Sequence, residues 1–292
     1  MGTSALDTQA AFTEQTARSL FRSQWAAITK LLAQYADRDL RDPEVERALR
    51  RIVDESTGGV FSQAWADALE GALRDAATVA SRDVWQAGGE VVDLGDLAFS
   101  DAIRARAERS AFSITGTTVD EMAAAYDRVQ AATGGTALVA DFMDHLHATT
   151  FSPQRLDSRS ATVGQTESTS GAGMGKQAAA EQSDGAWTKV WHHDGAPVHP
   201  RDWHEAMEGE EVPIDDAFSN GLQFPGDPDG DPEETINCTC SVEYVLRAAQ
   251  EGVDIEITDD SGAVQRVVHL GLATTQAPGQ PLVGLGVKVT ER

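Results

Sequence analysis

Four side chains in the C-terminal half of the sequence could bind a metal ion. They are His199 and His204, together with Cys238 and Cys240, which a single residue separates. Imidazole and thiolate groups are ligands that zinc accepts, and a loop-rich segment gains folding free energy when it binds such an ion. The Cys-x-Cys spacing is tighter than the usual Cys-x₂₋₄-Cys, so a metal-free alternative stays open. In that alternative His204 hydrogen-bonds a loop and the two cysteines are small core residues.

Other polar clusters nearby lack the remaining parts of a catalytic or binding motif. The acidic run that starts at Asp227 does not have the glycine and glutamate that a calcium-binding EF-hand loop needs at its sixth and twelfth positions. His192 and His193 precede Asp194, but no serine or cysteine lies in a recognisable nucleophile motif. The sequence therefore predicts no catalytic activity, and we interpret the two histidines as the exposed end of a strand.

The stretch from 191 to 240 combines aromatic residues, turn-forming glycines and prolines, and both cysteines in a distinctive order. In chain order this pattern consists of Trp191, Asp194, His204, Gly209, Val212, Pro213, Phe218, Gly221, Pro225, Gly226, Asp227, Pro228, Asn237, Cys238 and Cys240. The pattern resembles the C-terminal module of the phage Mu F-like head morphogenesis family, the minor head proteins of tailed phages. Upstream, Thr166 and Glu167 resemble the Thr-Glu pair at the start of the family's long helix.

The resemblance implies a structural role in a virion. Proteins of this family lie at the portal vertex or inside the capsid, are made in the host cytoplasm, and are linked to head assembly, DNA packaging or ejection. The expected partners are the phage portal protein and the major capsid protein. The expected structural motif of the module is Asp194, Gly209, Pro213, Phe218, Pro225, Gly226, Asp227 and Asn237. The alternative is a zinc-dependent enzyme or toxin-like effector that carries a Mu F-like module.

The charge balance excludes one large class of function. The 292 residues include 23 Lys and Arg against 47 Asp and Glu, which gives a formal net charge of −24 at pH 7. Because a DNA-binding surface needs clustered basic side chains, we expect no sequence-specific nucleic-acid binding. Acidic membrane surfaces are disfavoured for the same reason, and the sequence shows neither a signal-peptide pattern nor a membrane-spanning apolar run.

The N-terminal half shows the periodicity of helices. Phe21, Trp25, Ile28, Leu32 and Tyr35 recur at spacings of four and three residues, which places them on one helix face. That face is either core or a docking surface for a ring-shaped partner such as a portal. Further helices are expected from Pro43 to about 56, over 61–85, 96–112 and 118–132, and up to about 147, with Thr117 and Thr118 as N-caps of the 118–132 helix.

Together these patterns predict an α+β protein with an N-terminal helical domain, a long helical connector and a small strand-and-loop module. The expected units are a helical domain over 1–150, the connector over 151–185, the Mu F-like module over 186–250, and a β-hairpin with an extended tail over 251–292. The connector is expected to be only weakly amphipathic, because small and polar residues dominate it. The hairpin follows from the alternation of Val253, Ile255 and Ile257 with polar residues.

Overall fold

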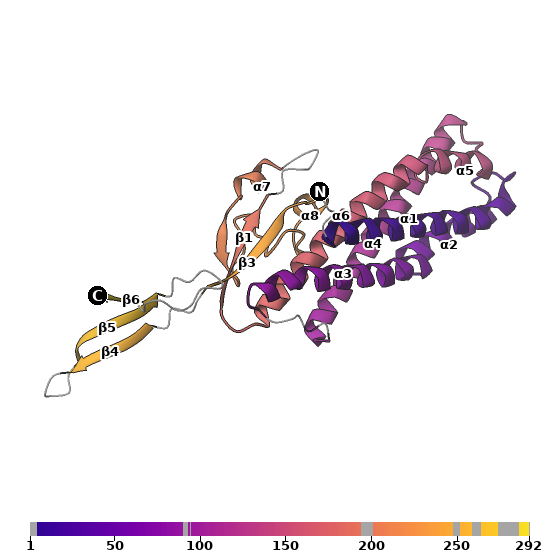
Figure 1. Cartoon of the computed structure of the whole chain (residues 1–292). Helices are drawn as coiled ribbons and strands as arrows, with labels where there is room; N and C mark the ends of the chain where they lie inside the picture. The colour runs from indigo at the N-terminus through magenta and orange to yellow at the C-terminus, as the bar shows by residue number, and fades with distance from the viewer. Residues whose placement is uncertain are drawn as a thin grey trace.

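The computed structural model describes residues 5–89, 93, 95–193 and 201–247, and three strands between 252 and 291 (Figure 1). The described chain is mostly helical and carries a small antiparallel sheet after the helices, so the predicted α+β class is confirmed. The first elements are α1 (Ala5–Leu32), η1 (Ala33–Tyr35), α2 (Pro43–Thr57), α3 (Val60–Gln86), α4 (Leu97–Ala132), α5 (Val139–Ala148) and α6 (Pro153–Glu181). The later elements are β1 (Ala186–His192), α7 (Asp202–Ala206), β2 (Glu211–Pro213), α8 (Pro232–Thr235), β3 (Ser241–Arg247), β4 (Gly252–Thr258), β5 (Val264–Ala273) and β6 (Gly286–Glu291).

Helix α6 is the central helix of the helical body. It packs along both α1 and α3, so the segment expected to be a connector is helical but belongs to the core. Its glycines allow the backbones to approach closely. A Cβ added at Gly171 would lie 2.8 Å from the carbonyl oxygen of Leu73, and one added at Gly175 would lie 2.4 Å from that of Ala77. The weak amphipathicity of α6 therefore reflects an interface of small residues rather than an exposed linker.

Helix α4 is continuous where the sequence predicted two shorter helices. The hydroxyl of Thr117 donates a hydrogen bond to the carbonyl oxygen of Ser113 at 2.9 Å, and that of Thr118 donates to Ile114 at 3.2 Å. These bonds run back one turn along a helix that is already formed, so neither threonine acts as an N-cap. The N-cap of α4 is Asp96, whose carboxylate accepts a hydrogen bond from the backbone of the first turn.

The apolar stripe of α1 lies in the core. Phe21, Ile28 and Leu32 are fully buried, and Trp25 and Tyr35 are partly buried against the same core. Phe21 packs edge-on against a tryptophan of α3, with the ring centroids 4.7 Å apart. Three of the five side chains are fully buried and two are partly buried, which favours the core alternative for this stripe over the docking face.

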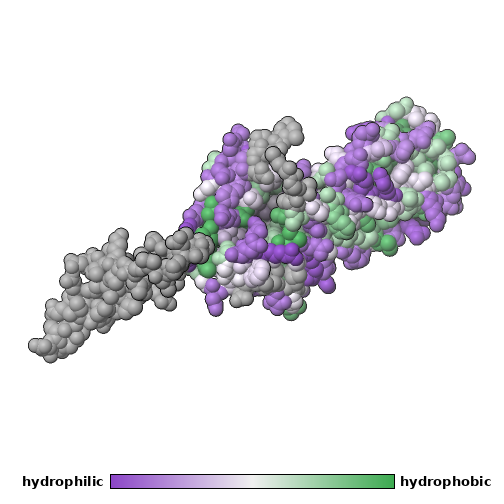
Figure 2. All heavy atoms as spheres, in the orientation of Figure 1, coloured by the Kyte–Doolittle hydropathy of each residue, from purple (hydrophilic) through white to green (hydrophobic). Residues whose placement is uncertain are grey.

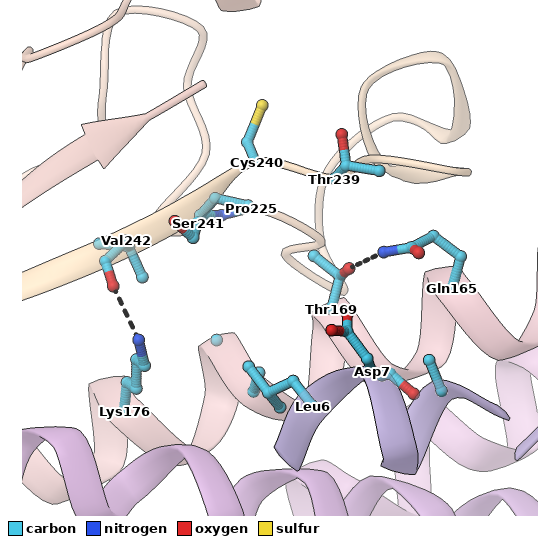
Figure 3. A pocket seen from close by; sticks show the side chains of 14 residues that line it. Leu6, Asp7, Gln165, Thr169, Lys176, Pro225, Thr239, Cys240, Ser241 and Val242 are labelled. Atoms are coloured by element: carbon cyan, nitrogen blue, oxygen red, sulfur yellow. Dashed lines mark hydrogen bonds between the residues drawn. The ribbon is translucent and has the colours of Figure 1, made fainter. Parts of the chain in front are cut away.

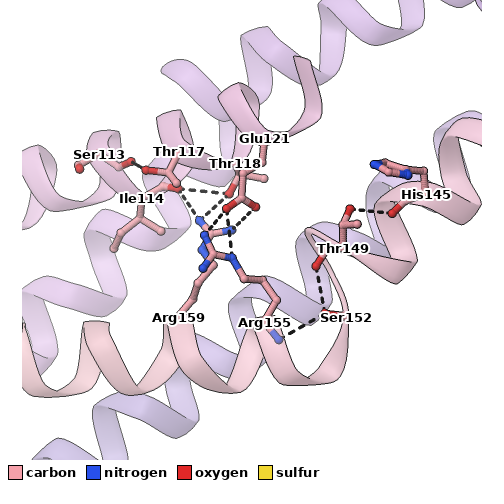
Figure 4. Close-up of polar contacts among 10 residues, drawn as sticks. All are labelled: Ser113, Ile114, Thr117, Thr118, Glu121, His145, Thr149, Ser152, Arg155 and Arg159. Carbon is pink, nitrogen blue, oxygen red and sulfur yellow. Dashed lines mark hydrogen bonds and ion pairs between the residues drawn. The ribbon is translucent and has the colours of Figure 1, made fainter. Parts of the chain in front are cut away.

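A buried arginine of α6, Arg159, contacts both α4 and α1, and Figure 4 shows its contacts with α4. The Nη2 group of Arg159 donates hydrogen bonds to the carbonyl oxygen of Ile114 at 3.0 Å and to the hydroxyl of Thr118 at 2.9 Å. Its guanidinium lies 4.4 Å from the ring centroid of Phe21. Burial lowers the pKa of Arg159 to about 10, although the negative charge of Glu121 opposes the shift. The side chain is therefore charged at neutral pH and depends on these partners.

Replacing this arginine with lysine is expected to destabilise the helical body. In Arg159→Lys, a compact ammonium replaces the planar fork and its ring contact, so we expect the free energy of unfolding to fall by about 1–3 kcal/mol. Urea denaturation followed by helical circular dichroism measures the change. The matched control is Arg155→Lys, because Arg155 is exposed and forms only a surface ion pair with Glu121. If Arg159→Lys and Arg155→Lys lower the free energy of unfolding equally, Arg159 does not join the helices as described.

The first sheet follows α6 and has β1 as its central strand. β1 pairs antiparallel with β2 on one side and with β3 on the other. Along β1 the buried positions are Trp187, Lys189 and Trp191, and they alternate with more exposed residues. One face of the strand is therefore buried, which also fixes the register of its neighbours.

The second sheet contains the expected hairpin and one further strand. β4 pairs antiparallel with β5, in agreement with the alternation of Val253, Ile255 and Ile257. β6 pairs with the other edge of β5, so Gly286–Glu291 is a paired strand within the segment predicted as an extended tail. The alternation of Val287 and Val289 is the local signal for this strand, and neighbouring glycines and prolines obscured it.

The surface of the molecule mixes residue types. Figure 2 shows hydrophilic residues over much of the visible face, with hydrophobic residues between them. Isolated exposed apolar side chains of this kind are ordinary in folded proteins. In the part of the chain that the structure describes, no helix has both the length and the apolar character needed to span a lipid bilayer.

Candidate metal centre

Three side chains predicted as metal ligands meet in the C-terminal module. His204 lies on α7, while Cys238 and Cys240 lie in the turn between α8 and β3. The Nδ1 atom of His204 is 3.7 Å from the Sγ atom of Cys238 and 3.5 Å from that of Cys240. All three ligand atoms lie within 4.8 Å of one another and all three residues are buried. The cluster could hold a metal ion such as zinc.

Helix α6 fixes the turn that carries the cysteines. Asn237 adopts φ +56°, in the left-handed region that asparagine tolerates better than most residues. Its backbone N–H donates to the hydroxyl of Thr166 at 3.0 Å, and the hydroxyl of Thr169 donates to the carbonyl oxygen of Cys238 at 2.9 Å. The two thiols are therefore held by a turn that is hydrogen-bonded to the central helix.

A carboxylate orients the imidazole of His204. The Nε2 atom of His204 lies 2.7 Å from a carboxylate oxygen of Glu234, which also accepts a hydrogen bond from the indole N–H of Trp203 at 2.9 Å. If Nε2 carries the proton, the lone pair of Nδ1 faces the two sulfur atoms. This is the arrangement by which carboxylates orient metal-binding histidines, and it leaves Nδ1 available to an ion.

The electrostatics of the cluster favour the thiolate form that binds metals. Hydrogen bonding with Cys240, reinforced by His204, lowers the pKa of the Cys238 thiol to about 5 in spite of burial. Burial acts to lower the pKa of His204, but its hydrogen bonds with Cys238 and Glu234 outweigh this effect and raise it. A thiolate beside a positively polarised imidazole is the charge arrangement that a bound cation would replace.

The fourth predicted ligand, His199, lies outside the described residues, as does Asp194. A histidine that the sequence analysis did not select lies close to the cluster instead. The Nδ1 atom of His193 is 3.6 Å from the Sγ atom of Cys240. His193 follows directly after β1, so its position depends on strand pairing that the sequence alone did not reveal. The sequence signal that could have identified His193 is that a histidine, a possible metal ligand, stands at the end of the expected strand.

The side of the module next to β2 is shaped by three residues of the expected motif, Gly209, Pro213 and Phe218. Gly209 adopts φ +78°, a conformation that favours glycine, and its backbone N–H donates to the carbonyl oxygen of Trp191 at 2.9 Å. Pro213 ends β2 opposite Thr188 of β1. Phe218 is buried edge-on against Trp191, with the ring centroids 5.2 Å apart. The ring of Trp191 that Phe218 contacts also packs edge-on against the imidazole of His204.

The Pro-Gly-Asp-Pro turn packs against α6. Gly226 adopts φ +77°, and a Cβ added there would lie 2.9 Å from the backbone nitrogen of Ser170. The buried carboxylate of Asp227 accepts backbone hydrogen bonds from Gln223 at 2.8 Å and from residue 229 at 3.0 Å. Asp227 therefore stabilises its own turn, at the point where that turn approaches the central helix.

A cavity of about 320 Å³ lies beside the cysteine turn, between α1, α6 and the start of β3 (Figure 3). Pro225 and the backbone around Cys240 line it, while the sulfur of Cys240 points away from α6. The ammonium of Lys176 donates to the carbonyl oxygen of Val242 at 3.1 Å. The cavity and the sulfur atom of Cys240 therefore face different sides of the turn.

The structure also buries a lysine that sequence reasoning missed. Lys189 is fully buried on β1, and its ammonium donates to the side-chain oxygen of Gln223 at 2.5 Å. Burial lowers the pKa of Lys189 to about 8, although nearby carboxylates, first among them Glu181, oppose the shift. Its alternation with Trp187 and Trp191 is the one sequence signal that could have placed it on the inner face of the strand.

Comparison of the chain with protein-family models, with curated proteins and with solved structures finds no match. The candidate site is defined by its own residues. These are a buried histidine and two buried cysteines, a carboxylate that orients the histidine, and a central helix that fixes the cysteine turn.

Proposed function

We propose that this protein is a minor capsid (head morphogenesis) protein of a tailed phage, bound at the portal vertex. The observation that supports the proposal is the contact between two separated parts of the Mu F-like pattern. Thr166, from the Thr-Glu pair on α6, accepts a hydrogen bond from the backbone of Asn237, which opens the Asn-Cys-x-Cys segment. The motif residues thus depend on one another in space, as expected if they specify one family module.

In this proposal zinc is a structural component of the module. His204, Cys238 and Cys240 supply two thiolates and one imidazole, a donor set that suits zinc better than calcium or magnesium. The ion would supply folding free energy to a region with short strands and long loops. The helical body would bind the portal or capsid protein, and the net charge of −24 would keep the protein from adhering to packaged DNA.

Particles assembled from the genome that encodes this chain test the proposal. Quantitative mass spectrometry of purified DNA-filled particles is expected to detect the protein in few copies relative to the major capsid protein. Deletion of its gene is expected to reduce the yield of infectious particles, and the full-length chain supplied in trans should restore it. If purified particles lack the protein while the host lysate contains it, the proposed function is wrong.

The cluster of three mutual ligands also supports a second candidate, a zinc-dependent enzyme. Catalytic zinc sites commonly use three protein ligands and leave one coordination position for water or substrate. His204, Cys238 and Cys240 would fit such an arrangement. This candidate requires an open position on the metal, whereas a structural site uses four protein ligands. The occupant of the fourth position therefore separates the two functions.

A further inference from the structure

We propose that His193 is the fourth ligand of this centre and closes it as a four-coordinate structural site. The inference rests on the proposed binding of zinc at His204, Cys238 and Cys240. It replaces the sequence-based choice of His199 with a residue at the end of β1. It also assigns a function to a side chain that neither the family pattern nor the three-residue cluster includes.

Three separations in the cluster match edges of a tetrahedral zinc site, although His193 does not lie within 4.8 Å of all three other ligand atoms. With Zn–S bonds of about 2.3 Å and Zn–N bonds of about 2.0–2.1 Å, a thiolate sulfur and an imidazole nitrogen at the tetrahedral angle are about 3.6 Å apart. His204 lies 3.7 Å from the sulfur of Cys238 and 3.5 Å from that of Cys240. His193 lies 3.6 Å from the sulfur of Cys240, by the same type of atom, Nδ1. Each of these three distances fits one edge of the tetrahedron.

The pairing of β1 with β3 explains why His193 approaches Cys240. In this antiparallel ladder His192 lies opposite Ser241, so the next position beyond the ladder places His193 beside Cys240. A carboxylate oxygen of Glu208 accepts a hydrogen bond from the backbone N–H of His193 and fixes the chain at this point. The backbone is thus held at the point where the ring of His193 reaches the sulfur of Cys240.

His192 provides a natural contrast to its neighbour. Its two ring nitrogens lie 3.2 Å from carboxylates of Glu208 and Glu243. Successive side chains along a strand point to opposite faces, so only one histidine of the pair can face the cysteines. The structure places His193 on that side.

A fourth protein ligand changes what the centre can do. With His193, His204, Cys238 and Cys240 all bound, no coordination position remains for a reacting water or substrate. The ion would instead tie the end of β1 to α7 and to the turn before β3. The site would then serve the structural role of the first candidate function and would be unsuited to the enzymatic one.

Cobalt is the probe that tests this inference, because its visible absorption reports the coordination number and its near-ultraviolet absorption reports thiolate ligands. The full-length protein is loaded with Co²⁺, and zinc affinity is measured by competition. We expect His193→Ala to weaken metal binding by more than about tenfold, the lower end of the loss typical of even an outer-shell partner. We also expect its visible bands to change as water enters the fourth position, while the thiolate absorption persists.

The control variants distinguish the possible outcomes. His192→Ala should match the wild type in affinity and spectrum, and circular dichroism establishes that each variant is folded. If folded His193→Ala behaves like His192→Ala, or if His199→Ala alone alters the cobalt spectrum, the inference is overturned although zinc binding stands. If the wild-type protein binds neither ion, the zinc component of the proposed function fails as well, and this inference fails with it.

Discussion

Removal of zinc is expected to unfold the module over 186–247 while the helical body remains folded. The module has a three-stranded sheet of short strands and long loops, and its candidate metal ligands join α7 to the turn before β3. Zinc present at about 1,000 times its dissociation constant stabilises the folded state by about 4 kcal/mol. For a unit of this size that corresponds to about 15–30 °C in the melting temperature. The buried residues contributed by α1, α3, α4 and α6 do not depend on the ion, so we expect the helices to melt in a later transition.

Differential scanning calorimetry with and without a zinc chelator measures this effect. The chelated protein should show a low-temperature transition that is absent from the zinc-loaded protein, and near-ultraviolet circular dichroism should assign it to the environment of Trp187 and Trp191. The matched variant is Cys238→Ser, which should melt like the chelated wild type and should not respond to the chelator. If zinc is shown to be removed and the melting profile does not change, the ion has no structural role.

Local sequence patterns were sufficient to predict much of the helical body and part of the candidate metal centre. The spacing of Phe21, Ile28 and Leu32 determines a helix face, and such periodicity depends only on residues close in sequence. His204, Cys238 and Cys240 could be selected by residue type, because few other side chains bind zinc. In each case, the information lies within a short segment or in the chemistry of a single side chain.

The features that the sequence did not reveal depend on contacts between distant segments. His193 approaches Cys240 because β1 pairs with β3 in one particular register, which residues near His193 do not specify. Lys189 is buried for a similar reason, since its environment is built by Gln223 and Phe218 from a later loop. The break expected in α4 did not form, because its threonine hydroxyls bond to the preceding turn instead of capping a new helix.

Helix α6 shows most clearly how hydropathy can mislead. Glycine and alanine contribute little to an apolar stripe, so the sequence predicts a weakly amphipathic helical connector for this segment. Gly164 and Gly171 nevertheless bring its backbone against α1 and α3, where a Cβ would lie 2.8 Å from the carbonyl oxygens of Ala10 and Leu73. Glycine is thus a packing requirement here, although it is a poor helix former in isolation.

Replacement of Gly175 by alanine should therefore destabilise the protein, whereas the same change at an ordinary helical glycine stabilises it. A Cβ in Gly175→Ala would lie 2.4 Å from the carbonyl oxygen and 2.5 Å from the Cα of Ala77. These are backbone atoms of α3, so no side-chain rotation relieves the clash and the two helices must separate. We expect the free energy of unfolding to fall by about 3 kcal/mol, measured by urea denaturation of the full chain followed by helical circular dichroism.

Gly116→Ala is the control that isolates this packing effect. Gly116 lies within α4, and a Cβ added there meets nothing within 4 Å. The same change should therefore stabilise the protein by about 0.5–1 kcal/mol, because alanine is the better helix former and restricts the unfolded chain. The propensity gain is common to both variants, so the difference between them measures the contact of α6 with α3. If Gly175→Ala stabilises the protein as Gly116→Ala does, α6 does not pack against α3 at this point. That result would support the interpretation of residues 151–185 as a connector.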